Sequence, residues 1–141
     1  MHDLNYPDLY LQMILESTQT IAVVGASIKP ARASYRVTRF LLDKGYRVFP
    51  VNPQYVGQTI HDLPIVETLS DIKDKIDMVD IFRRSDVAGE TIDDAISMGA
   101  KVVWAQLEVI DYKAAERAEN AGLKVVMDRC PAIEYPRLIG V

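Results

Sequence analysis

Basic side chains gather in one short segment whose residue types favour binding of an anion. Between Ile28 and Arg39 the chain holds four basic residues and no acidic ones, namely Lys29, Arg32, Arg36 and Arg39. The segment follows Gly25, and apolar spacing beyond it predicts a helix that begins near Ser34. Free N–H groups at a helix N-terminus bind anions, and nearby arginine and lysine strengthen such a site. We therefore expect an anion here, the alternative being solvated surface charges around an ordinary strand-to-helix turn.

The elements that must position these residues are those of a parallel sheet. Short Val- and Ile-rich runs without strict alternation predict strands buried on both faces, at Thr20–Gly25, Tyr46–Val51, Met78–Phe82, Lys101–Ala105 and Leu123–Met127. Between them, apolar residues at helical spacing predict three helices. The first is capped by Ser34 and ends at Gly45, the second ends at Gly99, and the third is capped by Asp111 and ends at Gly122.

Fold class follows from this alternation of strands and helices. We expect one Rossmann-like α/β domain over residues 1–141, a doubly wound, mainly parallel sheet of five to six strands in three αβα layers. The predicted strand order is 3-2-1-4-5. An N-terminal helix within residues 1–18 packs on this domain. A short extra strand is expected near Ile65-Val66 and a turn of helix near Ser70.

Ligands of open parallel sheets bind outside the carboxyl ends of the strands, so the residues after each strand are the candidate site. The second strand is followed by Asn52-Pro53-Gln54-Tyr55, and the third by Phe82-Arg83-Arg84-Ser85. The fourth ends in Trp104–Glu108 and the last in Asp128–Pro131. Arg83-Arg84 adds a second basic pair to the rim that holds Lys29 and Arg32, which favours anion binding.

The glycine pattern of dinucleotide-binding folds is incomplete. Gly-x-Gly-x-x-Gly needs two further glycines after Gly25, where Ser27 and Pro30 stand. The acidic residue that holds a ribose 2′-hydroxyl is also absent, because the second strand ends in Val51-Asn52-Pro53. Binding of NAD is therefore disfavoured, whereas NADP stays open because basic residues would meet its 2′-phosphate.

Residues for covalent or metal chemistry are few. Cys130 is the one candidate nucleophile, and the neighbouring Arg129 would favour its thiolate. Its general base would be His61, since the other histidine, His2, lies at the start of the chain. The alternative is a structural Cys130 and a surface His61. No histidine pair has metal-ligand spacing, so we predict neither a metal site nor a catalytic residue.

Composition narrows the partners and the compartment. The chain has 141 residues, 49% of them apolar, and a net charge of −4, which disfavours nucleic acid and anionic membranes as partners. No run approaches the roughly 20 apolar residues of a transmembrane helix, and the N-terminus lacks the pattern of a signal peptide. A single cysteine fits a reducing cytoplasm. We expect a cytoplasmic protein with a small-molecule ligand, and a homodimer or an unidentified protein partner stays open.

Four motifs in order carry a family resemblance. They are Val23–Ser27 with Pro30–Val37, then Val48–Pro53, Val79–Ser85 and Val125–Cys130. Together they resemble the small stand-alone CoA-binding proteins, which are similar to the CoA-binding domain of the succinyl-CoA synthetase alpha subunit. The resemblance covers residues 15–138. The family often has glycine where this chain has Glu108, and its C-terminal tail commonly lacks a proline such as Pro136.

The resemblance implies a Rossmann-like domain that holds coenzyme A across the carboxyl edge of the sheet, with the Gly25–Ser27 turn at the phosphates. Three phosphate groups suit a basic rim on an acidic protein. The predicted cofactor-binding residues are Gly25, Ala26, Ser27, Lys29, Arg32, Ser34, Tyr35, Asn52, Pro53, Gln54, Phe82, Arg83, Arg84 and Gln106.

The predicted function is binding of coenzyme A or an acyl-CoA without a complete catalytic site. The ligase relatives carry a phosphorylated histidine in a separate domain, which we expect a chain of this length to lack. Two alternatives remain open. One is an NADP- or nucleotide-dependent enzyme on the same fold, and the other is an interaction module with a vestigial pocket.

Overall fold

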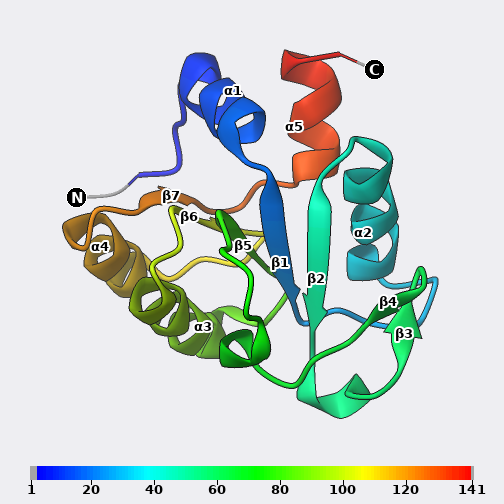
Figure 1. The fold of residues 1–141 in the computed structure, drawn as a ribbon. Helices are drawn as coiled ribbons and strands as arrows, with labels where there is room; N and C mark the ends of the chain where they lie inside the picture. Colours follow the sequence, from blue (N-terminus) through cyan, green and yellow to red (C-terminus); the bar gives the residue numbers. More distant parts are fainter. Residues whose placement is uncertain (1–2, 141) are drawn as a thin grey trace.

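A five-stranded parallel sheet forms the centre of the computed structural model, which describes residues 3–140 (Figure 1). Its strands are β1 (Thr20–Val24), β2 (Arg47–Val51), β5 (Met78–Ile81), β6 (Val102–Ala105) and β7 (Lys124–Val126). A separate antiparallel hairpin is formed by β3 (Thr59–Ile60) and β4 (Leu63–Pro64). The predicted Rossmann-like α/β fold is confirmed, and each predicted strand is found to within one residue at either end. His2 lies outside the described residues.

The order of the strands in the sheet differs from the predicted one. It is β2-β1-β5-β6-β7, so the five predicted strands are ordered 2-1-3-4-5 and the prediction 3-2-1-4-5 is wrong. The strand at Met78–Ile81 lies beside β1, where Val23 is the register partner of Asp80. The position outside β2 is taken by the expected extra strand near Ile65-Val66, which is reduced to one parallel bridge between Val66 and Val51.

Two short 3-10 helices lie in the connection between β2 and β5. They are η1 (Pro53–Tyr55) and η2 (Leu69–Asp71). The second one is the predicted helical turn near Ser70. It begins with a capping box in which Thr68 and Asp71 bond to each other's backbone.

Helices cover both faces of the sheet and complete the three layers (Figure 1). One face packs against α3 (Ser85–Met98) and α4 (Tyr112–Asn120). The other packs against α1 (Asp8–Ser17), α2 (Ala33–Asp43) and α5 (Pro131–Leu138). Alternate strand residues supply the two apolar cores, because successive side chains of a strand point to opposite faces.

The ends of the helices test the predicted capping residues. Asp111 caps α4 as predicted, since its carboxylate accepts a hydrogen bond from the amide of Ala114 at 3.0 Å. The prediction for Ser34 is wrong, because α2 begins at Ala33 and Ser34 lies within its first turn. The Ser34 hydroxyl accepts from the amide of Ser27 at 3.0 Å instead. It therefore holds the preceding loop against the helix.

Two N-terminal tyrosines cover the edge strand β7. The Tyr10 hydroxyl donates to the carbonyl of Val125 at 3.0 Å and accepts from its amide at 3.1 Å. The Tyr6 hydroxyl accepts from the amide of Met127 at 2.7 Å. These bonds occupy backbone groups that an edge strand otherwise leaves open to pairing. Burial raises the pKa of Tyr6 to about 12, so the hydroxyl stays protonated at neutral pH.

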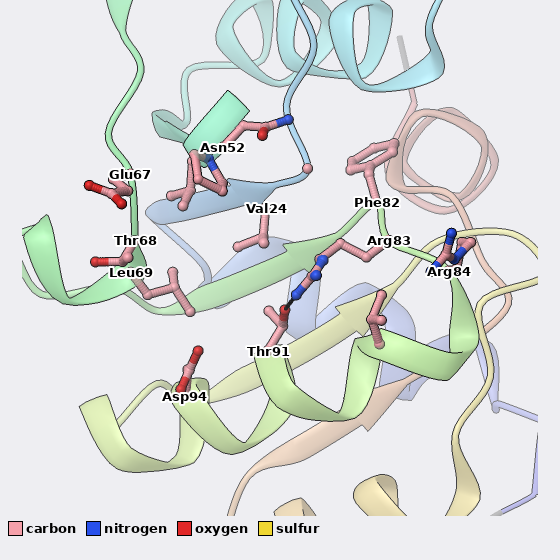
Figure 2. Close-up of a pocket in the computed structure, with 14 residues that line it drawn as sticks. Val24, Asn52, Glu67, Thr68, Leu69, Phe82, Arg83, Arg84, Thr91 and Asp94 are labelled. Atoms are coloured by element: carbon pink, nitrogen blue, oxygen red, sulfur yellow. Dashed lines mark hydrogen bonds between the residues drawn. The ribbon is translucent and has the colours of Figure 1, made fainter. Parts of the chain in front are cut away.

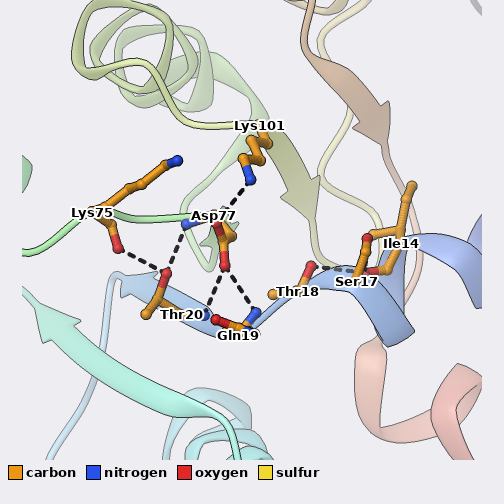
Figure 3. A network of polar contacts seen from close by, with 8 residues as sticks. All are labelled: Ile14, Ser17, Thr18, Gln19, Thr20, Lys75, Asp77 and Lys101. Carbon is orange, nitrogen blue, oxygen red and sulfur yellow. Dashed lines mark hydrogen bonds and ion pairs between the residues drawn. The ribbon is translucent and has the colours of Figure 1, made fainter.

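A carboxylate at the amino end of the sheet ties three segments together (Figure 3). Asp77 Oδ2 accepts from the amides of Gln19 at 2.9 Å and Thr20 at 3.2 Å. Lys101 Nζ lies 3.7 Å from Asp77 Oδ1. Partial burial alone would raise the pKa of Asp77, but the two amides and the lysine charge outweigh it and lower the pKa below its usual value.

Within the part of the chain that the structure describes, no helix has the length and apolar character required to cross a membrane.

Candidate functional site

A groove runs along the carboxyl edge of the sheet and consists of two adjoining cavities. The α2-side cavity has a volume of about 540 Å³ and lies at the start of α2. The α3-side cavity has a volume of about 530 Å³ and lies between α3 and the segment before η2. They share the residues Gly25, Asn52, Phe82 and Arg83. The two cavities together form the groove that the strand-end rule predicts.

At the centre of the groove, the turn that follows β1 lies in close contact with the backbone at the end of β5. Gly25 has φ +89°, and its amide donates to the carbonyl of Val51 at 2.9 Å. A Cβ at this position would overlap the carbonyl oxygen of Phe82. Glycine is therefore required both by the backbone conformation and by the close approach of the two strand ends.

Asn52 fastens the end of β2 to this turn. Its Nδ2 donates to the carbonyl of Ala26 at 2.8 Å, and its Oδ1 accepts from the amide of Gln54 at 2.9 Å. Both ends of the amide thus have partners within the protein. Asn52 lines the groove as predicted, but its role in this structure is to shape the groove wall.

Within the groove, positive charge without a partner in the described chain is found in the α2-side cavity alone. Among the residues the structure describes, the Lys29 and Arg32 side chains have no ion-pair or hydrogen-bond partner, and both are exposed. The amides of Ala33 and Ser34 at the start of α2 likewise have no acceptor in the described chain. Two free cations and two free amides at a helix N-terminus form a site for an anion.

Other basic residues of the segment and the rim are engaged. Arg36 donates to the carbonyl of Ala31 at 2.7 Å, and Arg84 donates to Asp86 at 3.1 Å. Arg129 donates to the carbonyl of Leu4 at 2.7 Å. Of the basic rim expected from the sequence, two side chains are therefore left unpaired, Lys29 and Arg32.

The α3-side cavity has a different character (Figure 2). Its floor and walls include the apolar side chains of Val24, Val51 and Leu69. Glu67 and Asp94 bring negative charge to its rim. Arg83 extends across the cavity to Thr91, to which it donates at 3.2 Å (Figure 2). This cavity suits a flat, partly apolar group better than a phosphate.

The predicted binding residues all line the groove except Ala26 and Tyr35. Ala26 is fully buried and donates its amide to Val51. Tyr35 instead packs against His61, with ring centroids 4.2 Å apart. The Nε2 atom of His61 lies 2.8 Å from the Tyr35 carbonyl oxygen, so this nitrogen donates the hydrogen bond.

Several lining residues were not predicted from the sequence. They are Val24, Ala33, Val51, Tyr55, Glu67, Thr68, Leu69, Val87, Thr91, Asp94, Leu107 and Val109. A helical spacing of three and four residues runs from Arg84 through Val87 and Thr91 to Asp94. This signal identifies the face of α3 that adjoins the groove. Glu67–Leu69 had no comparable signal, because their position depends on the path by which the irregular β2–β5 connection returns to the sheet.

Two buried polar side chains near this edge have no partner in the described chain. Asp80, on the central strand β5, is completely buried, and neither carboxyl oxygen has a hydrogen-bond partner. Burial raises the pKa of Asp80 well above its usual value, which favours the protonated form. Gln106 is 6% exposed and lines the α2-side cavity, and its Oε1 also has no partner.

The candidate nucleophile is placed away from the groove. Cys130 is 6% exposed, precedes α5 and packs with Trp104 in the core on the α2 side. It does not line either cavity. Within residues 3–140, no group of three or more His, Cys, Asp or Glu side chains is placed to hold a metal ion.

The backbone of Glu108 is strained. This residue lies in the loop that follows β6, beside the α2-side cavity. Glu108 has φ +68°, its amide donates to Asp128 Oδ1 at 2.7 Å, and its carbonyl accepts from the Ser85 hydroxyl at 3.1 Å. These bonds hold a non-glycine residue in the left-handed conformation, at a cost of about 1–2 kcal/mol.

Replacing Glu108 with glycine is expected to raise the free energy of unfolding by about 1 kcal/mol, because relief of strain exceeds the added flexibility of the unfolded chain. Urea unfolding measures this change. Glu108→Ala is the matched control, since it removes the carboxylate but keeps the strain, and it should give no gain. A Glu108→Gly variant less stable than the native protein would contradict the assignment of strain.

Comparison with known proteins extends these observations. Residues 19–136 match the family described as CoA binding domain. The uncharacterized protein YneT of Bacillus subtilis (strain 168) is 34% identical over 125 residues, which is 89% of this chain and 91% of that protein. A hypothetical protein from Pyrococcus horikoshii OT3 has a structure that matches with TM-score 0.91 and 38% identity, over 99% of this chain and 100% of that one.

A further match is to part of a larger enzyme. The apo form of dinucleotide forming acetyl-coenzyme A synthetase 1 of Ca. Korarchaeum cryptofilum matches with TM-score 0.64 and 30% identity. The match covers 76% of this chain and 25% of the synthetase chain. The likeness to the synthetase therefore concerns one portion of that enzyme.

Proposed function

The chain belongs to the CoA-binding domain family, and from this premise we propose that it binds coenzyme A or an acyl-CoA in the groove at the carboxyl edge of its sheet. The free cations and free amides at the start of α2 are the observation that carries the proposal. Lys29, Arg32 and the amides of Ala33 and Ser34 have no acceptors of their own within residues 3–140. Pyrophosphate oxygens would supply acceptors to all four.

The two cavities of the groove correspond to two parts of the ligand, its phosphates and its adenosine. Phosphates belong in the α2-side cavity, which has basic but no acidic lining residues. The adenosine belongs in the α3-side cavity, where Val24, Val51 and Leu69 offer apolar contact to the adenine ring. Phe82 lies at the junction of the two cavities, and Arg83 reaches across it. Arg83 would meet the phosphorylated ribose between them.

The proposed role is binding without a complete catalytic site in this chain. Cys130 is buried outside the groove, and the imidazole of His61 is occupied by the carbonyl of Tyr35. Neither the proposed nucleophile nor its base therefore faces the groove.

Calorimetric titration with CoA, dephospho-CoA, NAD and NADP tests the proposal. We expect CoA to bind more tightly than dephospho-CoA, because the 3′-phosphate adds a charge-assisted contact. We expect both to bind more tightly than NAD. Absence of CoA binding at millimolar concentration would overturn the proposal, and tighter binding of NADP would favour a dinucleotide site.

Replacing Arg32 with alanine should weaken CoA binding about tenfold, because one charge-assisted bond to a phosphate is lost. The decline of affinity with salt should also become less steep. Arg39→Ala is the matched control on α2, the helix that begins directly after Arg32, since Arg39 pairs with Asp43 at 3.1 Å outside the groove. Equal affinities of the two variants would remove Arg32 from the site.

A further inference from the structure

We infer that Gln106 pairs with an amide group of the bound ligand and thereby selects ligands that carry a pantetheine arm. This inference rests on the proposed function and specifies one contact within it. Gln106 follows β6 directly and lines the α2-side cavity. It is held in place by its own backbone, whose amide donates to the carbonyl of Ile81 at 3.1 Å.

The Gln106 carboxamide lacks partners at both ends within the described chain. Its Oε1 is buried and accepts no hydrogen bond, and its Nε2 makes no hydrogen bond either. Exchanging the oxygen and nitrogen by turning the amide leaves the same deficit. A buried amide oxygen without a partner is costly, and nearly all such groups in folded proteins are satisfied. The cavity is the direction from which a partner can come.

The partner that satisfies a carboxamide must both donate and accept. A phosphate offers acceptors only, so it would leave the amide oxygen of Gln106 unpaired. The N–H of a secondary amide would donate to the oxygen of Gln106, and the nitrogen of Gln106 would donate to an amide carbonyl. Because the N–H and the carbonyl of a trans amide point in opposite directions, the two bonds would involve two amides or one amide and another acceptor. Pantetheine contains two such amides. In the nucleotide portion of CoA the adenine base also donates and accepts, but the proposed function places it in the α3-side cavity, which Gln106 does not line.

The place of Gln106 agrees with this assignment. The phosphate-binding start of α2 follows β1, and Gln106 follows β6, which is separated from β1 by β5 alone. Two strand spacings put the carboxyl ends of β1 and β6 about 10 Å apart along the edge. The same cavity is also lined by the apolar residues Leu107 and Val109, which follow Gln106 in the chain. A chain leaving the phosphates toward β6 would therefore meet both an amide partner and apolar surface.

The test compares CoA with adenosine 3′,5′-bisphosphate, which is the nucleotide of CoA without the arm. Gln106→Leu should bind CoA about tenfold more weakly than the native protein and bind the bisphosphate equally well. The ligand-free variant should be at least as stable as the native protein, because a buried oxygen without a partner is removed. Gln58→Leu is the control, since Gln58 is exposed outside both cavities.

A second measurement does not depend on how the variant folds. In the native protein, the side-chain amide NMR signals of Gln106 should shift on addition of CoA and stay unchanged with the bisphosphate. Equal affinity of Gln106→Leu and the native protein for CoA would overturn the inference while leaving the proposed function intact. So would an equal loss for both ligands. A native protein that binds neither ligand would overturn both.

Discussion

Gly25→Ala is expected to lower the free energy of unfolding by about 3 kcal/mol or more. Two costs add at this residue. A side chain at φ +89° is strained, and its Cβ would overlap the Phe82 carbonyl oxygen and lie 2.9 Å from the carbonyl carbon. The obstacle is backbone at the end of the central strand β5, so it has little freedom to move. Chemical denaturation of the purified variant measures the loss.

Gly57→Ala separates the two costs. Gly57 has φ +85°, nearly the same conformation, but an added Cβ there would meet no atom within 4 Å. This control should lose only the strain, about 1 kcal/mol. Equal losses for Gly25→Ala and Gly57→Ala would show that the close approach of β1 to Phe82 does not matter for stability.

Replacement of Asp80 by asparagine should remove a pH dependence of stability. Because burial raises the pKa of Asp80 in the folded protein, the folded state keeps a proton that the unfolded chain releases above about pH 4. Stability should therefore fall as pH rises from there to the folded pKa, by about 1.4 kcal/mol per pH unit from this group. Asp80→Asn cannot ionise, so its stability relative to the native protein should increase with pH over this range.

The matched control for Asp80 is Asp77→Asn, which should behave in the opposite way. Amide hydrogen bonds and Lys101 outweigh burial and lower the pKa of Asp77 in the folded protein. Its carboxylate therefore stabilises the fold above the unfolded pKa, and this contribution is lost as pH falls through the folded pKa. Urea unfolding at a series of pH values measures both variants. A constant difference between Asp80→Asn and the native protein would show that Asp80 has the same pKa folded and unfolded.

The strands of the main sheet were predictable because burial on both faces leaves continuous apolar runs in the sequence. The strand order was not predictable from those runs. It depends on the β2–β5 connection, whose strand pairing with the sheet is limited, within the described residues, to one bridge from Val66 to Val51. Ser34 illustrates a local limit, since a serine near a helix start is typical of a cap, yet its hydroxyl bonds to the Ser27 amide.

The site was predictable in outline for a related reason. Residues that follow parallel strands meet at one edge, so Gly25, Asn52 and Phe82 were expected together and lie together. Which arginines are free was not predictable. Arg36 and Arg84 are engaged by Ala31 and Asp86, and such pairing depends on side-chain directions that a sequence does not contain.

Asp80 lies within an apolar run, and nothing in that run shows whether its side chain is buried or reaches solvent. Its burial follows from the central position of β5, between β1 and β6, with helices on both faces. The position of β5 in the sheet, which could not be predicted from the sequence, therefore decides whether Asp80 is protonated.

An NMR titration with CoA, followed through the backbone amides of the protein, tests the central claim most directly. Binding in the groove should shift the amide signals of Gly25, Ser27, Lys29 and the start of α2, together with those of Phe82, Arg83 and Gln106. Signals from the amino end of the sheet around Asp77 should stay in place. Absence of shifts at millimolar CoA, or shifts confined to residues outside the groove, would contradict the claim that this edge of the sheet binds coenzyme A.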